Sequence, residues 1–235
     1  METPTPTPRS GIPFGRAALL GTFAAGLGGI AVAPAVSRLL SSAVPSAPGG
    51  LADVLPGLGG GWRIYSVQSP LPRFDPATFE LSITGLVEQP QTLRWSAVAA
   101  LPGVHQISNF HCVTGWSVDK VKWEGIRPQT IIDLVKPKPG AKFVTLQSLE
   151  APYVDQISMR QFMEPDAMLA RHQDGKPLTR SHGAPLRLVL PSMYGYKNVK
   201  WVRELRFDSV AAPGFWEQRG YDVDAWVGGS NGYGT

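Results

Sequence analysis

The sequence predicts an α+β fold with mixed β-sheets and short helices. Of the 235 residues, 43% are hydrophobic and 17% charged, which is enough apolar material for a sizeable core. The 22 prolines and 26 glycines favour a strand- and loop-rich domain over a helical bundle. Candidate strands and helices intermix without the regular strand–helix–strand rhythm of a parallel sheet, which indicates mixed sheets.

In the first half of the domain, alternating apolar and polar residues predict a strand over 79–87. Residues 92–103 (TLRWSAVAALPG) predict a short helix that stops at the Pro-Gly pair at its end. Residues 105–112 (HQISNFHC) predict a strand that ends in a loop, and 121–126 (VKWEGI) a strand-like turn. Residues 127–135 predict a short helix opened by a proline at its second position.

In the second half, residues 142–148 (KFVTLQS) and 184–191 (APLRLVLP) predict two further strands. The stretch 166–178 (DAMLARHQDGKPL) is interpreted as a helix ended by an Asp-Gly turn. Residues 197–207 predict a strand with mixed faces. Gly195, between two tyrosines, indicates a close approach of another chain segment to the backbone.

Four regions are expected along the chain. Residues 1–16 are polar and should be disordered, 17–40 form a signal or transmembrane segment, 41–61 a linker, and 62–235 the main domain. The uncharged run after two arginines fits an export signal, and the same order fits an uncleaved membrane anchor with its basic end inside. Because the run is rich in glycine and alanine and only weakly apolar, it favours the signal. A buried soluble helix is the third alternative. We therefore expect the main domain to lie outside the cytoplasm, exported or anchored to the cell membrane.

The formal net charge is +4, and the basic residues are spread along the chain without a block of like charge. This pattern is not that of a nucleic-acid-binding arm, so no nucleic-acid partner is expected. A mild excess of base suits an anionic ligand.

Cys112 is the single cysteine, which excludes an internal disulfide. It could be a buried structural residue, because free cysteine is among the most buried residue types. It could be a nucleophile, although His111 beside it would point to the opposite face of a strand. It could also be a metal ligand. One protein thiolate and four scattered histidines do not make a zinc site, so any metal would need further ligands from a cofactor.

Three segments resemble the sulfite oxidase-like family of molybdopterin-binding oxidoreductases, within the bacterial branch that includes the periplasmic methionine-sulfoxide reductase catalytic subunit. They are FHCVTGWSVDKVKWEGI (110–126), DGKPLTRSHGAPLRLVLPSMYGYKNVKW (174–201) and FWEQRGYDVDAWVG (215–228), in the family's order. The resemblance implies a sulfite oxidase-type fold and a molybdenum-molybdopterin cofactor. It also implies that Cys112 ligates the molybdenum and takes part in catalysis.

The same resemblance implies the residues that bind the cofactor. Ser148 matches a threonine that touches the cofactor, and His182 matches an asparagine that bonds to it. Arg187 matches a cofactor-binding arginine, whose fork of donors suits phosphate. Asn198, Val199 and Lys200 match a stretch that closes over the phosphate, and Tyr65 begins a segment similar to an early pterin-contacting one. Without the resemblance, Arg187 and Lys200 would be ordinary solvated residues.

Thr114 departs from the family pattern, since the reductase branch has a glutamate there, near the metal. This puts that branch's reaction in doubt for the present chain. We also expect no haem segment and no dimerisation domain, so that electrons pass through a separate partner such as a membrane haem protein.

The expected function is a two-electron oxygen-atom transfer on a small sulfur or nitrogen oxide, an oxyanion or a sulfoxide. The alternatives are a non-catalytic, membrane-tethered binding module on the same fold, and thiol chemistry at Cys112.

Overall fold

The structure, a computed structural model, describes residues 61–229. The predicted N-terminal tail, signal or membrane segment and the linker up to residue 60 lie outside the described residues and stay predictions. Between residues 61 and 229, no helix is long and apolar enough to cross a membrane.

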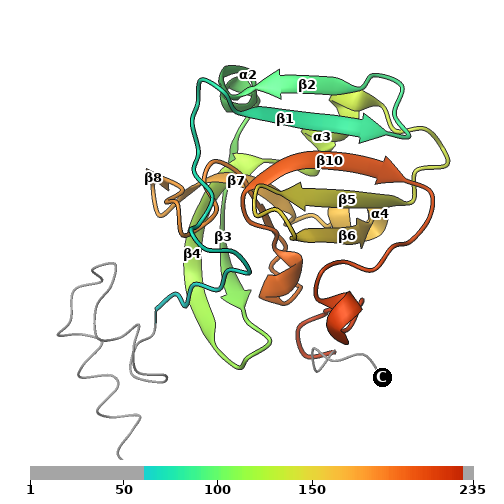
Figure 1. Cartoon of the computed structure of the whole chain (residues 1–235). Helices are drawn as coiled ribbons and strands as arrows, with labels where there is room; N and C mark the ends of the chain where they lie inside the picture. The colour runs from blue at the N-terminus through green and yellow to red at the C-terminus, as the bar shows by residue number, and fades with distance from the viewer. Residues whose placement is uncertain (1–60, 230–235) are drawn as a thin grey trace, which may run out of the picture. The chain divides into compact units, whose positions relative to one another are not determined.

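Two sheets organise the described chain, and the first contains five strands (Figure 1). Strand β1 pairs in parallel with β10, and every other neighbouring pair is antiparallel, so this sheet is mixed as predicted. In spatial order its strands are β2 (Gln91–Arg94), β1 (Glu80–Gly85), β10 (Val202–Asp208), β5 (Phe143–Ser148) and β6 (Val154–Ser158).

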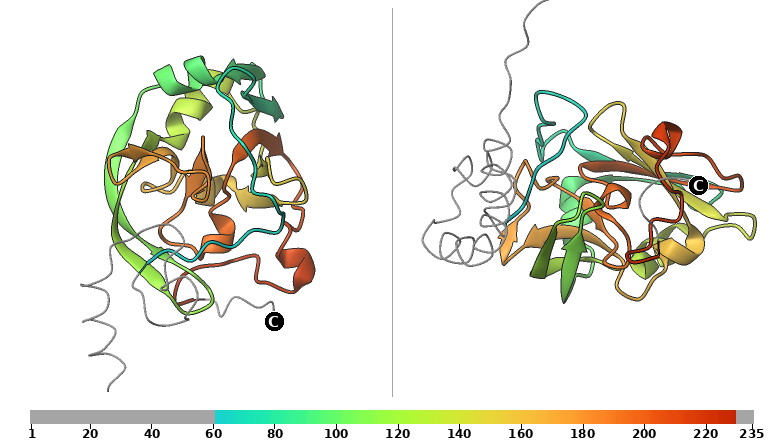
Figure 2. Two further views of the ribbon diagram at one scale, coloured as in Figure 1. Left: turned by 60° about the vertical axis from the view of Figure 1, so that its left-hand side comes forward. Right: turned by 90° about the horizontal axis from the view of Figure 1, so that it is seen from below.

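The second sheet is antiparallel, and its long β3–β4 pair extends beyond the first sheet (Figures 1 and 2). The free end of this pair carries the loop with Cys112. The strands are β3 (Val104–His111), β4 (Ser117–Ile126), β7 (Met168–Gln173) and β8 (Lys176–Pro177), with β9 (Arg187–Val189) paired to β7.

The helices are short. In α3 (Pro128–Val135), a proline occupies the first turn, where no backbone donor is needed. Ile131 and Val135, four residues apart, bury one face of α3 in the main core. The other helical elements are α2 (Trp95–Ala100), α4 (Met159–Phe162), η2 (Gly195–Lys197) and η3 (Glu217–Arg219).

The helix predicted over 166–178 is wrong, because this stretch forms the β7–β8 hairpin. Asp174 and Gly175 both have positive φ, 52° and 76°, which suits a two-residue hairpin turn rather than the end of a helix. Leu169 faces the main core, whereas Met168 and Ala170 face a second apolar cluster. Because both faces of β7 are buried, its sequence lacks the alternation that identifies a strand.

The helix predicted over 92–103 is wrong in its first part and right in its second. Residues up to Arg94 form β2, an edge strand, and the helix α2 begins at Trp95. Of the strand predicted over 197–207, only the part from Val202 onward is strand, since Lys197 ends η2 and residues 198–201 belong to neither element.

The other predicted elements are confirmed. Strands occur within 79–87, 142–148 and 184–191, the strand predicted over 105–112 is β3 with bounds shifted by one residue, and a helix occurs within 127–135. Residues 121–126, interpreted as a strand-like turn, form the end of β4.

A buried ion cluster ties the C-terminal segment to the first sheet. The Lys197 ammonium, 1% exposed, donates to Asp155 Oδ1 at 2.8 Å and forms a short contact with Glu217. Burial disfavours the lysine charge, but the attraction of the two carboxylates outweighs it and raises the pKa of Lys197. Burial also raises the pKa of Asp155, to about 7, even though Lys197 opposes this shift. The cluster joins η2, β6 and η3.

Lys197→Met should lower the free energy of unfolding by about 3–5 kcal/mol, because it leaves Asp155 and Glu217 buried without their cation. The control is Arg206→Met, which removes the half-exposed partner of Asp208 and should cost less than about 1 kcal/mol. Urea denaturation of both variants measures the difference. Equal losses would contradict a stabilising role for the buried cluster.

Candidate active site

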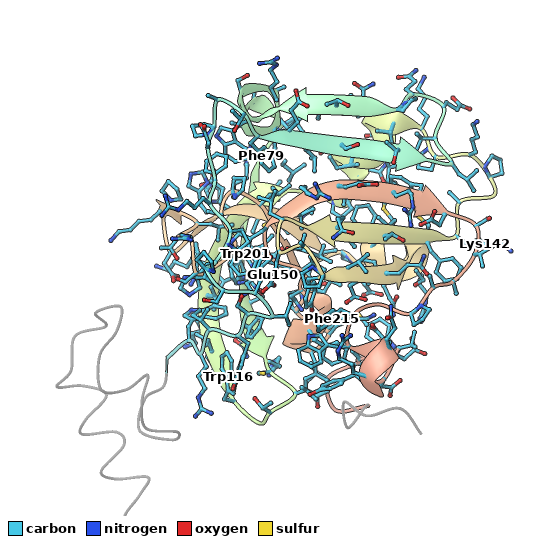
Figure 3. All side chains as sticks on the ribbon, in the orientation of Figure 1. Phe79, Trp116, Lys142, Glu150, Trp201 and Phe215 are labelled. Carbon is cyan, nitrogen blue, oxygen red and sulfur yellow. The ribbon has the colours of Figure 1, made fainter. Side chains whose placement is uncertain are left out.

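A cavity of about 320 Å³ brings together six of the eight residues predicted from the sequence. It lies between the free end of the β3–β4 pair, marked by Trp116 in Figure 3, and the C-terminal segment, marked by Phe215. Its lining includes Tyr65, Cys112, His182, Arg187, Asn198 and Lys200.

A larger cavity of about 450 Å³ lies along β1, β2 and β10. Its polar lining combines two arginines with three carboxylates, and it contains none of the predicted site residues. We therefore place the candidate site in the smaller cavity.

Cys112 follows β3 directly and begins the loop that joins β3 to β4. Its backbone N–H donates to the Trp116 carbonyl at 2.9 Å, and its carbonyl accepts from the Gly115 N–H at 3.1 Å. Gly115 has a φ of +85°, a conformation that glycine adopts without strain. The Cys112 side chain is partly exposed at the cavity, so it is not the fully buried structural cysteine of the first alternative.

Arg187 is the most unusual charge of the site. Leu188, its neighbour on β9, faces the main core, so Arg187 points to the opposite side, as its place in the strand predicts. That side is not solvent, because Arg187 is only 2% exposed. Its guanidinium carbon lies 5.2–5.6 Å from the ring centroids of Trp62, Phe110 and Trp123.

Arg187 has no carboxylate within ion-pair distance between residues 61 and 229, and its Nε has no hydrogen-bond partner there. One Nη donates to the His182 carbonyl at 3.3 Å. Burial lowers the pKa of Arg187 to about 10, so it is still charged at neutral pH. A buried cation of this kind needs an anion to complete its surroundings.

His182 and Lys200 lie near this charge. Burial lowers the pKa of His182 to about 4, and the positive charges of Arg187 and Lys200 add to the effect. The neutral ring contacts the Thr179 hydroxyl through Nδ1 at 2.7 Å, whereas its buried Nε2 has no partner between residues 61 and 229. Burial, followed by repulsion from Arg187, lowers the pKa of Lys200 to about 7. An anion in the cavity would favour the protonated form of both groups.

Two of the remaining predicted residues, Ser148 and Val199, do not line the cavity, whereas Asn198 lines it. Ser148 is 1% exposed and does not line the cavity, since its hydroxyl donates to the Lys200 carbonyl at 2.8 Å. Val199 is buried in the main core, and its carbonyl accepts from the Leu188 N–H. The Asn198 side-chain oxygen accepts from the Leu190 N–H at 2.7 Å. Ser148 and Val199 therefore position the strand and loop that carry Arg187 and Lys200.

Glu150 is a site residue that sequence reasoning missed. It is 3% exposed, and its Oε1 accepts from the backbone N–H groups of Val67 and Gln68 and from the Ser66 hydroxyl. These bonds hold the segment around Tyr65 against the cavity, and the Tyr65 carbonyl accepts from Lys200 Nζ at 2.6 Å. Glu150 is the second residue after β5, and nothing local in the sequence indicates a partner more than 80 residues away.

Aromatic residues form the other wall of the cavity and were also missed as site residues. Tyr153, Tyr196, Trp216 and Tyr221 line it, and the ion cluster at Lys197 lies behind them. The Tyr153 hydroxyl donates to the Tyr196 carbonyl, and burial raises the pKa of Tyr153 well above its ordinary value. In the sequence these residues resemble ordinary core aromatics.

Gly195 confirms the expected close approach. A Cβ atom added there would lie 2.4 Å from the Phe110 ring, so a side chain at this position would push against β3 next to Cys112. Trp123 and Trp201 are fully buried, whereas Trp116 is half-buried and lines the cavity.

The donor set suits an anionic cofactor rather than a metal ion held by protein ligands alone. Among residues 61–229, no three His, Cys, Asp or Glu side chains are arranged to hold a metal. Cys112 supplies one soft ligand. Arg187 Nε and His182 Nε2 are buried polar atoms without hydrogen-bond partners in the described part of the chain, and Lys200 adds a second positive group. This set fits a cofactor with a phosphate and a heterocycle rich in polar atoms.

The fold and this cavity are those of a protein that binds an anionic cofactor, and the comparison with known families identifies its class. Residues 68–216, more than half of the chain, match the family described as the oxidoreductase molybdopterin binding domain. The chain therefore belongs to this family of molybdopterin-binding oxidoreductases, which confirms the predicted family.

Curated relatives support this assignment. An uncharacterised oxidoreductase of Bacillus subtilis, YuiH, is 37% identical over 65% of this chain and 77% of its own length. A putative protein-methionine-sulfoxide reductase subunit of Azospira oryzae is 34% identical over 72% of this chain and 63% of its own. The methionine-sulfoxide reductase catalytic subunit of Campylobacter jejuni is 31% identical over 61% of this chain and 54% of its own. The chain thus spans about half to three quarters of these relatives.

The fold is confirmed independently by a solved structure. The sulfane dehydrogenase SoxCD of Paracoccus pantotrophus aligns with a TM-score of 0.55 and 22% identity, over 60% of this chain and 41% of that one. At this identity the likeness establishes the fold alone.

The low pKa of His182 predicts a pH-dependent stability in the cofactor-free protein. Between about 4 and 6.5 the unfolded chain binds a proton at His182 that the folded chain does not, so the free energy of unfolding should rise with pH across this window. His182→Gln should reduce that slope, and urea denaturation at several pH values measures it. His105→Gln, on the exposed part of β3, should keep the slope. Equal slopes in all three proteins would show that His182 is not the source of this pH dependence.

Proposed function

We propose that this chain is the catalytic domain of a molybdenum-dependent oxidoreductase that carries out a two-electron oxygen-atom transfer. The observation that supports this most directly is the placement of Cys112, as a partly exposed thiol, in the same cavity as Arg187 and Lys200. One end of a cofactor would meet a soft metal ligand and the other end two cations.

Different residues of the chain would bind different parts of this cofactor. Cys112 would bind the molybdenum as a thiolate, since coordination removes the proton from a thiol. Arg187 and Lys200 would neutralise the phosphate, and His182 would offer Nε2 to a polar atom of the pterin. Tyr65 would contribute through its segment, which Glu150 fixes. When bound, the cofactor supplies the two-electron and oxygen-transfer chemistry, and the protein supplies binding, orientation and electric field.

The proposed substrate is a sulfoxide or a small sulfur or nitrogen oxide. Two of the relatives are named protein-methionine-sulfoxide reductases, which supports a sulfoxide. Reduction of a sulfoxide to a sulfide takes up two electrons and two protons and releases one water. The electrons would come from a separate redox protein, and the word "subunit" in the names of these relatives supports such a partner.

The N-terminal sequence supports a proposal for the cellular location of the catalytic domain. The uncharged run after Arg9 and Arg16 supports export or anchoring, with the catalytic domain outside the cytoplasm. The electron donor would then be a protein of the same membrane, such as a haem protein.

Molybdenum content tests the proposed function. The protein made in a host that synthesises molybdopterin should contain about one molybdenum per chain, because a single thiolate in one cavity completes one site. Cys112→Ser should lose most of the metal, or keep it with an altered absorption spectrum, since a hydroxyl is a harder and weaker ligand. Mass spectrometry for molybdenum and absorption spectroscopy measure this. A folded wild-type protein without molybdenum would remove the proposal.

Arg187→Met should lower cofactor retention without destabilising the cofactor-free protein. Retained pterin should fall about tenfold or more, because a charged hydrogen bond is worth about 1.5–3 kcal/mol. The melting temperature of the cofactor-free protein should rise or stay unchanged, since a buried, unpaired cation is removed. The control is Arg203→Met, an exposed arginine of β10. Pterin measured by fluorescence after oxidation gives the first value. An Arg187→Met protein that keeps its pterin would contradict the phosphate role.

A further inference from the structure

The hydroxyl of Thr114 lies beside the thiol of Cys112. Their Oγ1 and Sγ atoms are 3.1 Å apart, and either atom could be the donor. Within residues 61–229, the Thr114 hydroxyl makes no other hydrogen bond. The sulfur is therefore its partner, and Thr114 also lines the cavity.

The backbone fixes this contact. The loop from Cys112 to Trp116 is closed by two hydrogen bonds, from the Cys112 N–H to the Trp116 carbonyl and from the Gly115 N–H to the Cys112 carbonyl. Gly115 completes the turn with its positive φ. Thr114 is thus held two residues after the cysteine in a tight turn, and a β-branched side chain has few χ1 rotamers with which to leave it.

The direction of the hydrogen bond follows from the state of the sulfur. A thiol can donate or accept, but a metal-bound thiolate has no proton. The Thr114 hydroxyl must then be the donor. A hydrogen bond to a charged acceptor is roughly twice as strong as one between neutral groups.

We propose that Thr114 is a positioning residue that donates a hydrogen bond to the metal-bound sulfur of Cys112 and so raises the reduction potential of the molybdenum; this rests on the proposed function. The bond draws electron density from the sulfur, which makes the thiolate a weaker electron donor to the metal. A weaker donor favours the reduced metal over the oxidised one. The bond also fixes the rotamer of the cysteine side chain toward the cavity.

Thr114 acts here as a neutral group. Its hydroxyl neither ionises nor takes up a proton near neutral pH, so it has no part as an acid or base. Its contribution is a dipole aimed at the sulfur, so in the protein with cofactor bound the effect of removing it should appear in the metal's potential and absorption rather than in proton transfer.

Two substitutions separate this role from simple packing. Thr114→Val keeps the shape of the side chain and removes the hydroxyl, whereas Thr114→Ser keeps the hydroxyl and removes a methyl group. Both should fold normally, because Thr114 is exposed in a loop. The readouts are molybdenum content, the one-electron midpoint potential of the metal from a redox titration followed by electron paramagnetic resonance, and the sulfur-to-metal charge-transfer absorption.

Thr114→Val should shift the one-electron equilibrium toward the oxidised metal by about tenfold, which corresponds to a potential about 59 mV more negative. Its charge-transfer band should also move, since the sulfur becomes a stronger donor. Thr114→Ser should stay within about twofold of the wild type, a range well inside that tenfold step. Equal potentials in all three proteins would overturn the proposal, and so would a serine variant that shifts as far as the valine variant.

The failure of this proposal differs from the failure of the proposed function. Wild-type protein that contains molybdenum but has a potential insensitive to Thr114→Val overturns the tuning role alone. Wild-type protein without molybdenum overturns both. The Raman S–H stretching band of the metal-free protein gives an independent readout of the contact, because Cys112 is the single cysteine of the chain. That band should shift in Thr114→Val and not in Thr114→Ser, and an unchanged band would overturn the contact itself.

Discussion

The site depends on the charge of Arg187, which has no ion-pair partner among the residues that the structure describes. A guanidinium that is 2% exposed has lost its water, and three aromatic rings replace only part of that stabilisation. Burial keeps His182 neutral and lowers the pKa of Lys200 to about 7, and repulsion from Arg187 adds to both shifts. Arg187 is buried on a strand whose neighbouring residue, Leu188, packs into the main core. A bound anion should therefore stabilise the folded protein.

The cavity exists because segments far apart in the chain are fixed to one another around this charge. Glu150 holds the segment after Trp62, and the ion cluster at Lys197 holds the C-terminal segment that carries Trp216. Phe110 packs against Gly195, so the strand that leads into Cys112 touches the loop that leads to Lys200. Each contact is buried and joins residues that are far apart in the sequence. The two walls of the cavity therefore depend on the same tertiary packing as the core.

This explains which parts the sequence could predict. The strand at 79–87 and the helix at 127–135 each have one buried face, so the regular spacing of apolar residues could be recognised in their sequences. Strand β7 has two buried faces and good helix formers in its sequence, and it was mistaken for a helix. Cys112 and Arg187 were found through their resemblance to a family, not through local chemistry. Glu150 was missed because its role consists of contacts with a distant segment.

The electrostatics of the cavity also explain why a neutral hydroxyl suits position 114. Glu150 is a carboxylate in the lining of the cavity, and hydrogen bonds from backbone N–H groups stabilise its negative charge. A second carboxylate at position 114 would place a negative charge close to a thiolate and oppose the cations that favour an anionic cofactor. A hydroxyl at the same position gives the sulfur a donor without adding charge. The cavity thus stays cationic around Arg187 and Lys200, and the sulfur of Cys112 is stabilised by a dipole in place of an ion.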